Sequence, residues 1–510
     1  MKKSSWTGTF LILAGLLWAG TAWGATYYID YANGSDSNNG TSRTTAWKKA
    51  PGMAGFGGTY YHVAGDSFIF KGGVTWPSDC YPWVINYGGT SGEVRDYYGV
   101  DKTWYDGDAW TRPVLDNESV PTVILVTVNA NYVTLDNFEV INFYWNLWSC
   151  NAERGYPRAA IFYVGYMKKH NYITNCYVHD WTHSDEPGLV DRMQICVQNA
   201  GGPHMIEGCV FDGSNDGHGG TSGMATYSWH IARNCIVRNM SNGILLAAGE
   251  VSNCDIGPIN GSFDPLTHEN AIEAVWIGRL DIFNNRIHDV RDGIVIMGKG
   301  SPENYYRIYN NLFYGTLSQS PISLDPRGGS GVAEIYNNTM VTAWAGAVIH
   351  NPGIPGSVAP WVVTARNNHV ISPGPKLMNS AVTVESNNLL QMTSVAAAAG
   401  YVADNLYRPT SADSPTVNAG TDNVNGLFSN DLLDVSRPQD GTWDIGCYEY
   451  AAVPAVPGDA DGDGDVDLDD FVILKQTFGA SPLTDTRADF DGDGDVDLDD
   501  FVILKGNFGS

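Results

Sequence analysis

The sequence predicts an all-β chain whose short strands stack in repeated rungs, followed by a small helical module at the C-terminal end. Three observations lead to this expectation. A four-residue phrase recurs through the middle of the chain, short alternating segments flank each copy, and an acidic 12-residue motif occurs twice near the end.

The recurring phrase consists of two small polar residues, a variable residue and an apolar residue. Its copies start at Asn175, Gly208, Asn234, Asn253, Asn284, Asn310, Asn337, Asn367 and Asn387. A unit that recurs in one register indicates stacked supersecondary elements. The corner of each unit needs a residue that tolerates left-handed dihedrals, and Asn does so while its amide can bond the copies above and below. The phrase therefore predicts an asparagine ladder.

The segments that flank each phrase alternate between apolar and polar residues, as in Arg279–Phe283, and this period of two is typical of strands. A third short strand begins at a small residue or Pro in successive repeats: Gly243, Ala271, Gly293, Pro321 and Ala347. Three strands per rung on a fixed corner make a β-solenoid. Four cysteines share one repeat position, which favours a stacked buried column and leaves pairing between neighbouring rungs open: Cys176, Cys209, Cys235 and Cys254.

The N-terminus has the features of an export signal. A basic start, Met1–Lys3, precedes the apolar run Phe10–Trp18 and small residues around Ala22, so residues 1–24 are expected to be a signal peptide. No other segment is apolar enough to span a membrane. The chain has 29 basic and 56 acidic residues, a net charge of −27. This acidity argues against a nucleic-acid partner, which requires a basic face.

Both ends of the repeat region resemble exported right-handed parallel β-helix proteins of the pectate-lyase-like class. The resemblance lies in Tyr27–Asp30, Asn33–Thr41, Ala46–Lys48 and Gly65–Gly73, and in the closing segments Ser436–Pro438 and Trp443–Tyr450. It implies a right-handed parallel β-helix over residues 25–450, with three strands per rung. Because this scaffold hosts lyases, hydrolases, epimerases and adhesins, the resemblance does not name a substrate.

A Pro/Ala linker at residues 451–457 leads to the duplicated acidic motif. Its aspartates are Asp459, Asp461, Asp463, Asp465 and Asp470, repeated as Asp489, Asp491, Asp493, Asp495 and Asp500. Oxygen ligands at loop positions one, three, five and twelve, with Gly at six, are what a Ca²⁺ loop requires. Asp rather than Glu at position twelve, together with the duplication, resembles a type I dockerin over residues 458–510.

The dockerin resemblance implies Ca²⁺ as a cofactor and a cohesin-bearing scaffold or cell-surface protein as a partner. Positions ten and eleven of such loops help to choose the cohesin. Here they are Leu468-Asp469 and Leu498-Asp499 rather than the small hydroxyl residues often found there, which puts a cellulosomal partner in doubt.

Strand alternation predicts which side chains face outward on the sheet formed by the third strands. The expected inward residues are Ile244, Ile272, Ile294, Ile322 and Val348, and the expected outward ones are Leu245, Glu273, Val295, Ser323 and Ile349, with Met297 and Asp325 two positions later. The candidate catalytic residues near this face are Lys299, Arg327, Glu273, Asp325 and His268. The candidate substrate-binding residues are Glu269, Asp216, His218 and His350.

Two reaction classes compete for these residues. In a polysaccharide lyase, Lys299 or Arg327 removes the proton α to a uronate carboxylate, and a cation, Ca²⁺ in the cleft included, offsets the growing charge. In a glycoside hydrolase two carboxylates flank the bond, and Glu273 and Asp325 are expected two rungs and about 10 Å apart. We favour the lyase, because two cations follow one strand in adjacent rungs of an acidic chain. A non-catalytic polysaccharide-binding solenoid is the third hypothesis, since outward charges on a solenoid are mostly solvated.

Overall fold

The computed structural model of the chain describes most of both predicted parts. The described residues are 24–145, 160–183, 195–199, 202–213, 224–259, 269–274, 278–297, 304–325, 331–351, 361–379, 384–422, 426–439, 441–451, 457–461, 465–479, 485, 487–491 and 494–509. The expected signal peptide lies outside these residues, apart from its last residue.

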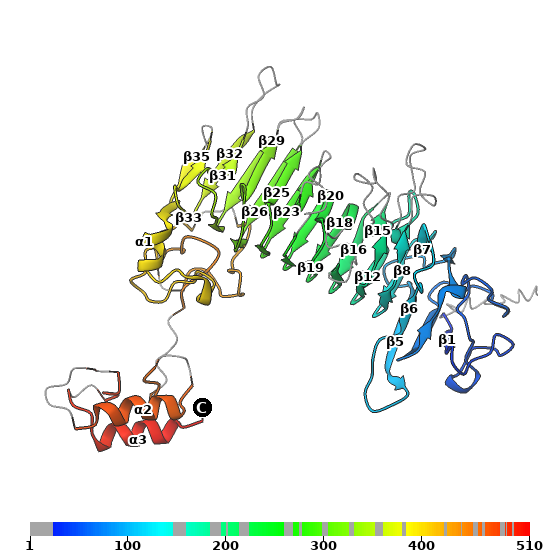
Figure 1. The fold of residues 1–510 in the computed structure, drawn as a ribbon, viewed down its shortest axis with the longest axis horizontal. Coiled ribbons are helices and arrows are strands. Elements are labelled where there is room, and N and C mark those ends of the chain that lie inside the picture. The colour runs from blue at the N-terminus through cyan, green and yellow to red at the C-terminus, as the bar shows by residue number, and fades with distance from the viewer. Residues whose placement is uncertain are drawn as a thin grey trace, which may run out of the picture.

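The first part is a parallel β-helix with three strands in each rung (Figure 1). The first sheet contains β4 (Trp83–Ile85), β7 (Ile124–Val128), β11 (Ala160–Val164), β15 (Ile195–Asn199), β18 (Met224–Arg233), β20 (Asn242–Ser252), β22 (Asn270–Ala274), β25 (Asp292–Met297), β28 (Ile322–Asp325), β31 (Ala347–His350) and β34 (Lys376–Met378).

The second sheet follows around the corner from the first. It contains β1 (Thr26–Ile29), β2 (Ser67–Gly72), β5 (Asp96–Tyr105), β8 (Val133–Asp136), β12 (Tyr172–Thr174), β16 (His204–Glu207), the later halves of β18 and β20, β23 (Arg279–Phe283), β26 (Asn304–Tyr309), β29 (Gly331–Tyr336), β32 (Val362–Arg366) and β35 (Val384–Ser386). Because β18 and β20 run through the corner, the first two sheets are joined into one sheet of 22 strands.

The third sheet has 12 strands and closes each rung. It contains β3 (Thr75–Trp76), β6 (Val114–Asp116), β9 (Glu139–Ile141), β13 (Tyr177–His179), β17 (Val210–Asp212), β19 (Ile236–Arg238), β21 (Asp255–Ile256), β24 (Arg286–His288), β27 (Leu312–Tyr314), β30 (Thr339–Val341), β33 (His369–Ser372) and β36 (Leu389–Met392). A separate pair, β10 (Tyr144–Trp145) and β14 (Thr182–His183), lies beside the rungs. The inward side chains of all three sheets form one continuous apolar core.

The corner between the second and third sheets contains the predicted asparagine ladder. Two positions of the phrase contribute to it: the first Asn forms the turn, and the second Asn forms the hydrogen bonds between rungs. The first Asn of each pair takes the left-handed conformation, with φ of 52° at Asn310 and 48° at Asn337. The second Asn is buried and forms the ladder: Asn311 Nδ2 donates to Asn338 Oδ1 at 3.0 Å, and Asn338 Nδ2 donates to Asn368 Oδ1 at 3.0 Å. The sequence analysis assigned both tasks to one residue, because the phrase alone cannot show which amide points inward.

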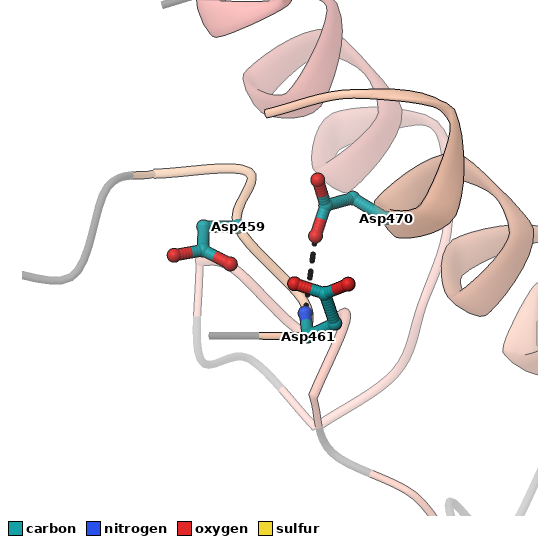
Figure 2. A group of neighbouring side chains, drawn as sticks. All are labelled: Asp459, Asp461 and Asp470. Atoms are coloured by element: carbon teal, nitrogen blue, oxygen red, sulfur yellow. Dashed lines mark hydrogen bonds between the residues drawn. The ribbon is translucent and has the colours of Figure 1, made fainter. Parts of the chain in front are cut away.

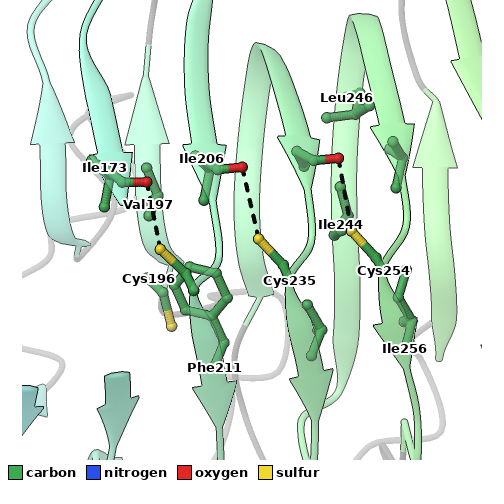
Figure 3. Close-up of a cluster of buried hydrophobic side chains, with 14 of the residues drawn as sticks. Ile173, Cys196, Val197, Ile206, Phe211, Cys235, Ile244, Leu246, Cys254 and Ile256 are labelled. Atoms are coloured by element: carbon green, nitrogen blue, oxygen red, sulfur yellow. Dashed lines mark hydrogen bonds between the residues drawn. The ribbon is translucent and has the colours of Figure 1, made fainter. Parts of the chain in front are cut away.

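The ladder position is occupied by cysteine in the earlier rungs. The thiols of Cys209, Cys235 and Cys254 each point to a main-chain carbonyl of the preceding rung, and the Sγ–O distances are 3.7 Å for Cys235 to Ile206 and for Cys254 to Ala232 (Figure 3). None of the cysteines that the structure describes forms a disulfide, so the stacked buried column is confirmed. Burial raises the pKa of the Cys209 and Cys254 thiols.

The last rungs carry a segment that returns along the same corner. After β36 comes the short helix α1 (Thr393–Ala398), and the first-position amides of later rungs then donate to carbonyls of Ala419, Thr421, Asn430 and Asp444. Asn310 Nδ2 donates to the carbonyl of Asn430, and Asn337 Nδ2 donates to that of Asp444. A buried ion pair between Arg437 and Glu449, 2.9 Å from nitrogen to oxygen, stabilises this segment.

The C-terminal module contains two helices, α2 (Leu468–Thr477) and α3 (Leu498–Asn507), as the duplicated motif predicts. Its small core is formed by Ala460, Val466, Leu474, Ala488, Val496 and Leu504. The repeats are tied by matching main-chain bonds: Gly479 N donates to Val496 O, and Gly509 N donates to Val466 O, both at 2.8 Å. Among the described residues, no helix of the chain is long and apolar enough to cross a membrane.

Candidate metal loops and the outer face of the first sheet

The first acidic loop brings three carboxylates together. Oxygen atoms of Asp459, Asp461 and Asp470 lie within 4.8 Å of one another. Figure 2 shows these three side chains, which come from the loop and from the first turn of α2. Asp470 is almost completely buried. Its Oδ1 accepts the N–H groups of Ala460 and Asp461, and its Oδ2 accepts that of Asp467. Burial opposes ionisation of Asp470, but these donors outweigh it and lower the pKa of the carboxyl.

The second loop repeats this arrangement. Oxygen atoms of Asp489, Asp491 and Asp500 lie within 4.8 Å of one another, and Asp500 accepts the N–H groups of Phe490 and Asp497. Gly494, at position six, has a φ of +99°, a conformation that side chains rarely adopt, which explains why Gly is required there. Asp463 and Asp493 lie outside the described residues, and Asp465 and Asp495 are exposed in their loops.

Both loops can hold a metal ion. Three converging carboxylates per loop provide the hard oxygen ligands that Ca²⁺ prefers, and the negative charge gathered there needs a cation to offset it. When bound, the ion would link residues at both ends of each loop. Ca²⁺ would then fix the position of the helix that carries the twelfth residue.

The outer face of the first sheet follows the predicted alternation from β20 to β28. Leu245, Glu273, Val295 and Ser323 stand in one row of paired residues across these strands. Ile244, Ile272, Ile294 and Ile322 form the matching inward row and are buried in the core. The predicted faces of these four strands are therefore confirmed.

The prediction for the next strand is wrong by one residue. Ile349, expected outside, is paired with Ile322 and fully buried, and His350 is paired with Ser323 in the outward row. Val348 is also buried. Three consecutive apolar residues at 347–349 fit either register, so only the pairing with β28 decides between them. His350 Nδ1 lies 3.3 Å from Asn379 Nδ2, on the neighbouring strand end.

Glu273 is the outward carboxylate that the structure describes most fully, and it is not solvated. Its exposed fraction is 9%, and Asn270 Nδ2 donates to its Oε2 at 3.1 Å. Asn270 is itself buried, its N–H donates to Asn242 Oδ1, and its Oδ1 has no partner among the residues that the structure describes. The sequence analysis did not single out Asn242 and Asn270. The sequence feature that could have identified them is the recurrence of Asn at the start of β20 and of β22.

The remaining candidates are placed only in part. Lys299, Arg327, His268, Asp216 and His218 lie outside the described residues. Of Asp325 the structure describes the main chain, which is paired with Met297 two positions beyond Ser323. Glu269 directly precedes β22 in a left-handed conformation and is half-buried.

The aromatic residues of this part of the chain are also informative. Trp104 packs against Tyr28 and is only 7% exposed, so it offers no platform to a ligand. The large exposed rings include Tyr87 and Tyr166.

Comparison with known proteins gives one family match. Residues 457–509 match the model of the dockerin type I domain. Comparison with curated proteins gives no match.

Several solved structures are similar to this chain. A rhamnogalacturonan lyase is 15% identical, with a TM-score of 0.45, covering 72% of this chain and 87% of that one. A pectate lyase is 17% identical, with a TM-score of 0.45, covering 85% and 98%. A GH136 lacto-N-biosidase from Eubacterium ramulus is 13% identical, with a TM-score of 0.39, covering 67% of both chains. Similarity at this level carries no conclusion about activity. The chain thus joins a parallel β-helix to a C-terminal type I dockerin.

Proposed function

We propose that this chain is an exported carbohydrate-active enzyme that cleaves an acidic, uronate-containing polysaccharide by β-elimination. The dockerin holds it to a cohesin-bearing scaffold or cell-surface protein. Ca²⁺ in the two acidic loops supports the folded dockerin. The presence of a dockerin supports attachment to a larger extracellular assembly.

The observation that carries the proposed chemistry is the register of β25 and β28. Met297 and Asp325 are paired, and Lys299 and Arg327 each follow two residues later. Two cations that each follow one of these adjacent strands in the sequence suit β-elimination, since one group can take the α proton while a neighbour offsets the carboxylate charge. Glu273, buried on the same face two rungs from Asp325, provides a carboxylate that can orient a sugar hydroxyl.

A glycoside hydrolase remains the second candidate because Glu273 and Asp325 belong to the same face. The pairing places them two strands apart and also two residues apart along the strand direction. By strand geometry their Cα atoms are then about 12 Å apart. This is more than the sequence analysis assumed, and inverting hydrolases hold their carboxyl groups about 6.5–9.5 Å apart. The offset favours the lyase.

The test is a polysaccharide panel read for both reducing ends and ultraviolet absorbance of unsaturated uronates. Lys299→Ala and Arg327→Ala are expected to lower turnover by at least about a hundredfold, with Glu273→Gln milder. Reducing ends without unsaturated product, lost in Glu273→Gln but kept in Lys299→Ala, would replace the lyase by the hydrolase. Binding with neither product would leave a non-catalytic solenoid.

A further inference from the structure

Three turns follow β4, β7 and β11 and lie at one edge of the first sheet. We call residues 86–95, 129–132 and 165–171 the basic corner. The turns are stacked, since Asn129 N donates to Ile85 O at 2.8 Å and Gly165 N donates to Val128 O at 2.9 Å. Tyr132 N also donates to Lys169 O. Residues from three rungs therefore form one surface.

Positive charge gathers in this corner of an otherwise acidic chain. Arg95 lies 3.5 Å from the ring centroid of Tyr172, and its Nη2 donates to His170 O. Lys168 and Lys169 directly precede His170. Within the described part of the chain, Arg95 and these two lysines form no ion pair. The acidic side chain of these turns, Glu93, accepts a bond from Ser91 instead.

The same corner presents aromatic rings and amides to solvent. The exposed fractions of Tyr87 and Tyr166 are 58% and 72%. Asn86, Asn129 and Asn131 are exposed beside them. Aromatic faces pack against the apolar faces of sugars, and amides can both donate to and accept from hydroxyl groups. Lysines add charge-assisted bonds to carboxylates. Together these groups fit a sugar polymer that bears carboxylates.

We propose that the basic corner is a second binding site for a carboxylated polysaccharide, separate from the reactive region. The proposal rests on the proposed function for its substrate class. Lys299 and Arg327 follow later strands at the same edge, and β25 is five strands beyond β11, about 24 Å along the solenoid. The corner therefore holds a part of the polymer distant from the bond that is cleaved.

The test compares the full chain with its Lys168→Ala/Lys169→Ala variant. The probes are polygalacturonate and its methyl-esterified form, which differ in charge but not in the sugar. At low salt the double variant should bind polygalacturonate about tenfold more weakly, whereas binding of the esterified polymer should not change. Added salt should narrow this difference, because screening weakens exposed charge pairs. Tyr166→Ala should weaken binding of both polymers.

The control is Lys475→Ala/Lys505→Ala, which removes the same charge from exposed positions on the dockerin helices. Three results would overturn the proposed site in the basic corner. They are an equal loss of binding in the control, unchanged binding of polygalacturonate in Lys168→Ala/Lys169→Ala, or a wild type that does not bind polygalacturonate. Failure of the proposed function looks different. Lysine-dependent binding without any unsaturated product would refute β-elimination and support the corner.

Discussion

The asparagine ladder allows a sharp test of how the β-helix is stabilised. Asn311 is fully buried and makes bonds in both directions. Its Nδ2 donates to Ile282 O at 2.9 Å and to Asn338 Oδ1 at 3.0 Å. Its Oδ1 accepts from the N–H and the Nδ2 of Asn285, both at 3.0 Å. Asn311→Leu removes all four bonds while keeping a side chain of similar volume.

The cost follows from the groups left without partners. The Asn285 N–H loses its acceptor, and the Ile282 carbonyl loses one donor. Asn285 Nδ2 keeps Val251 O, and Asn338 Oδ1 keeps the main-chain N–H of Asn311. Two buried groups at about 1–3 kcal/mol each predict a loss of about 2–6 kcal/mol in the free energy of unfolding.

Asn310→Gly is the matched comparison. Asn310 has a φ of 52°, which Gly adopts freely, so this variant loses only the bond to Asn430 O. A cost of about 1 kcal/mol is expected. Denaturant unfolding followed by the β-sheet signal measures both variants. Equal cost in the two, or no loss in Asn311→Leu, would refute the assignment of the ladder to the second Asn.

Two further predictions concern the metal loops and a surface histidine. Residues 457–510 expressed alone should gain helical circular dichroism on adding Ca²⁺ and lose it in chelator, since metal binding supplies folding free energy; a signal indifferent to Ca²⁺ would contradict this. Burial disfavours the charged ring of His288, but bonds to Asp255 and Asp289 outweigh it and raise its pKa. The stability that this charge adds should be complete below pH 6.5 and lost as the pH rises through the raised pKa. We expect less than about 1 kcal/mol, because both carboxylates are partly exposed. His288→Gln should reduce the change in stability across this pH range. If the variant keeps the wild-type pH profile, another group is responsible for that change.

The sequence predicted features that repeat and missed features that depend on pairing. The corner phrase predicted the rungs because αL dihedrals and stacked amides restrict which residues fit. The acidic motif predicted the loops because ligand spacing is fixed by the ion. The register at Val348 and Ile349 could not be predicted, since a one-residue shift keeps an apolar residue inside. Burial of Glu273 on an outer face depends on its surroundings, and strand alternation says nothing about those. The basic corner gathers residues from three rungs, which a linear sequence separates.

The sequence also did not predict that the closing segment stabilises the last rungs. Substitutions in the Arg437–Glu449 ion pair can test this contribution. The two side chains are 0% and 1% exposed. Glu449 Oε2 also accepts the Asp444 N–H, and Arg437 donates to the carbonyls of Asp444 and Gly446. Glu449→Ala would leave the guanidinium buried without its counter-charge.

Breaking such a pair from one side costs about 3–5 kcal/mol. Replacing both partners by apolar residues, Arg437→Met with Glu449→Leu, should cost less, because no charge is then left buried. Residues around this pair bond Asn337 and Asn367, so Glu449→Ala should also raise hydrogen exchange at the last rungs more than at the first. Two results would show that the segment does not stabilise the end of the solenoid through this ion pair. One is an equal rise of hydrogen exchange at the first and last rungs in Glu449→Ala, and the other is a double variant that is less stable than Glu449→Ala.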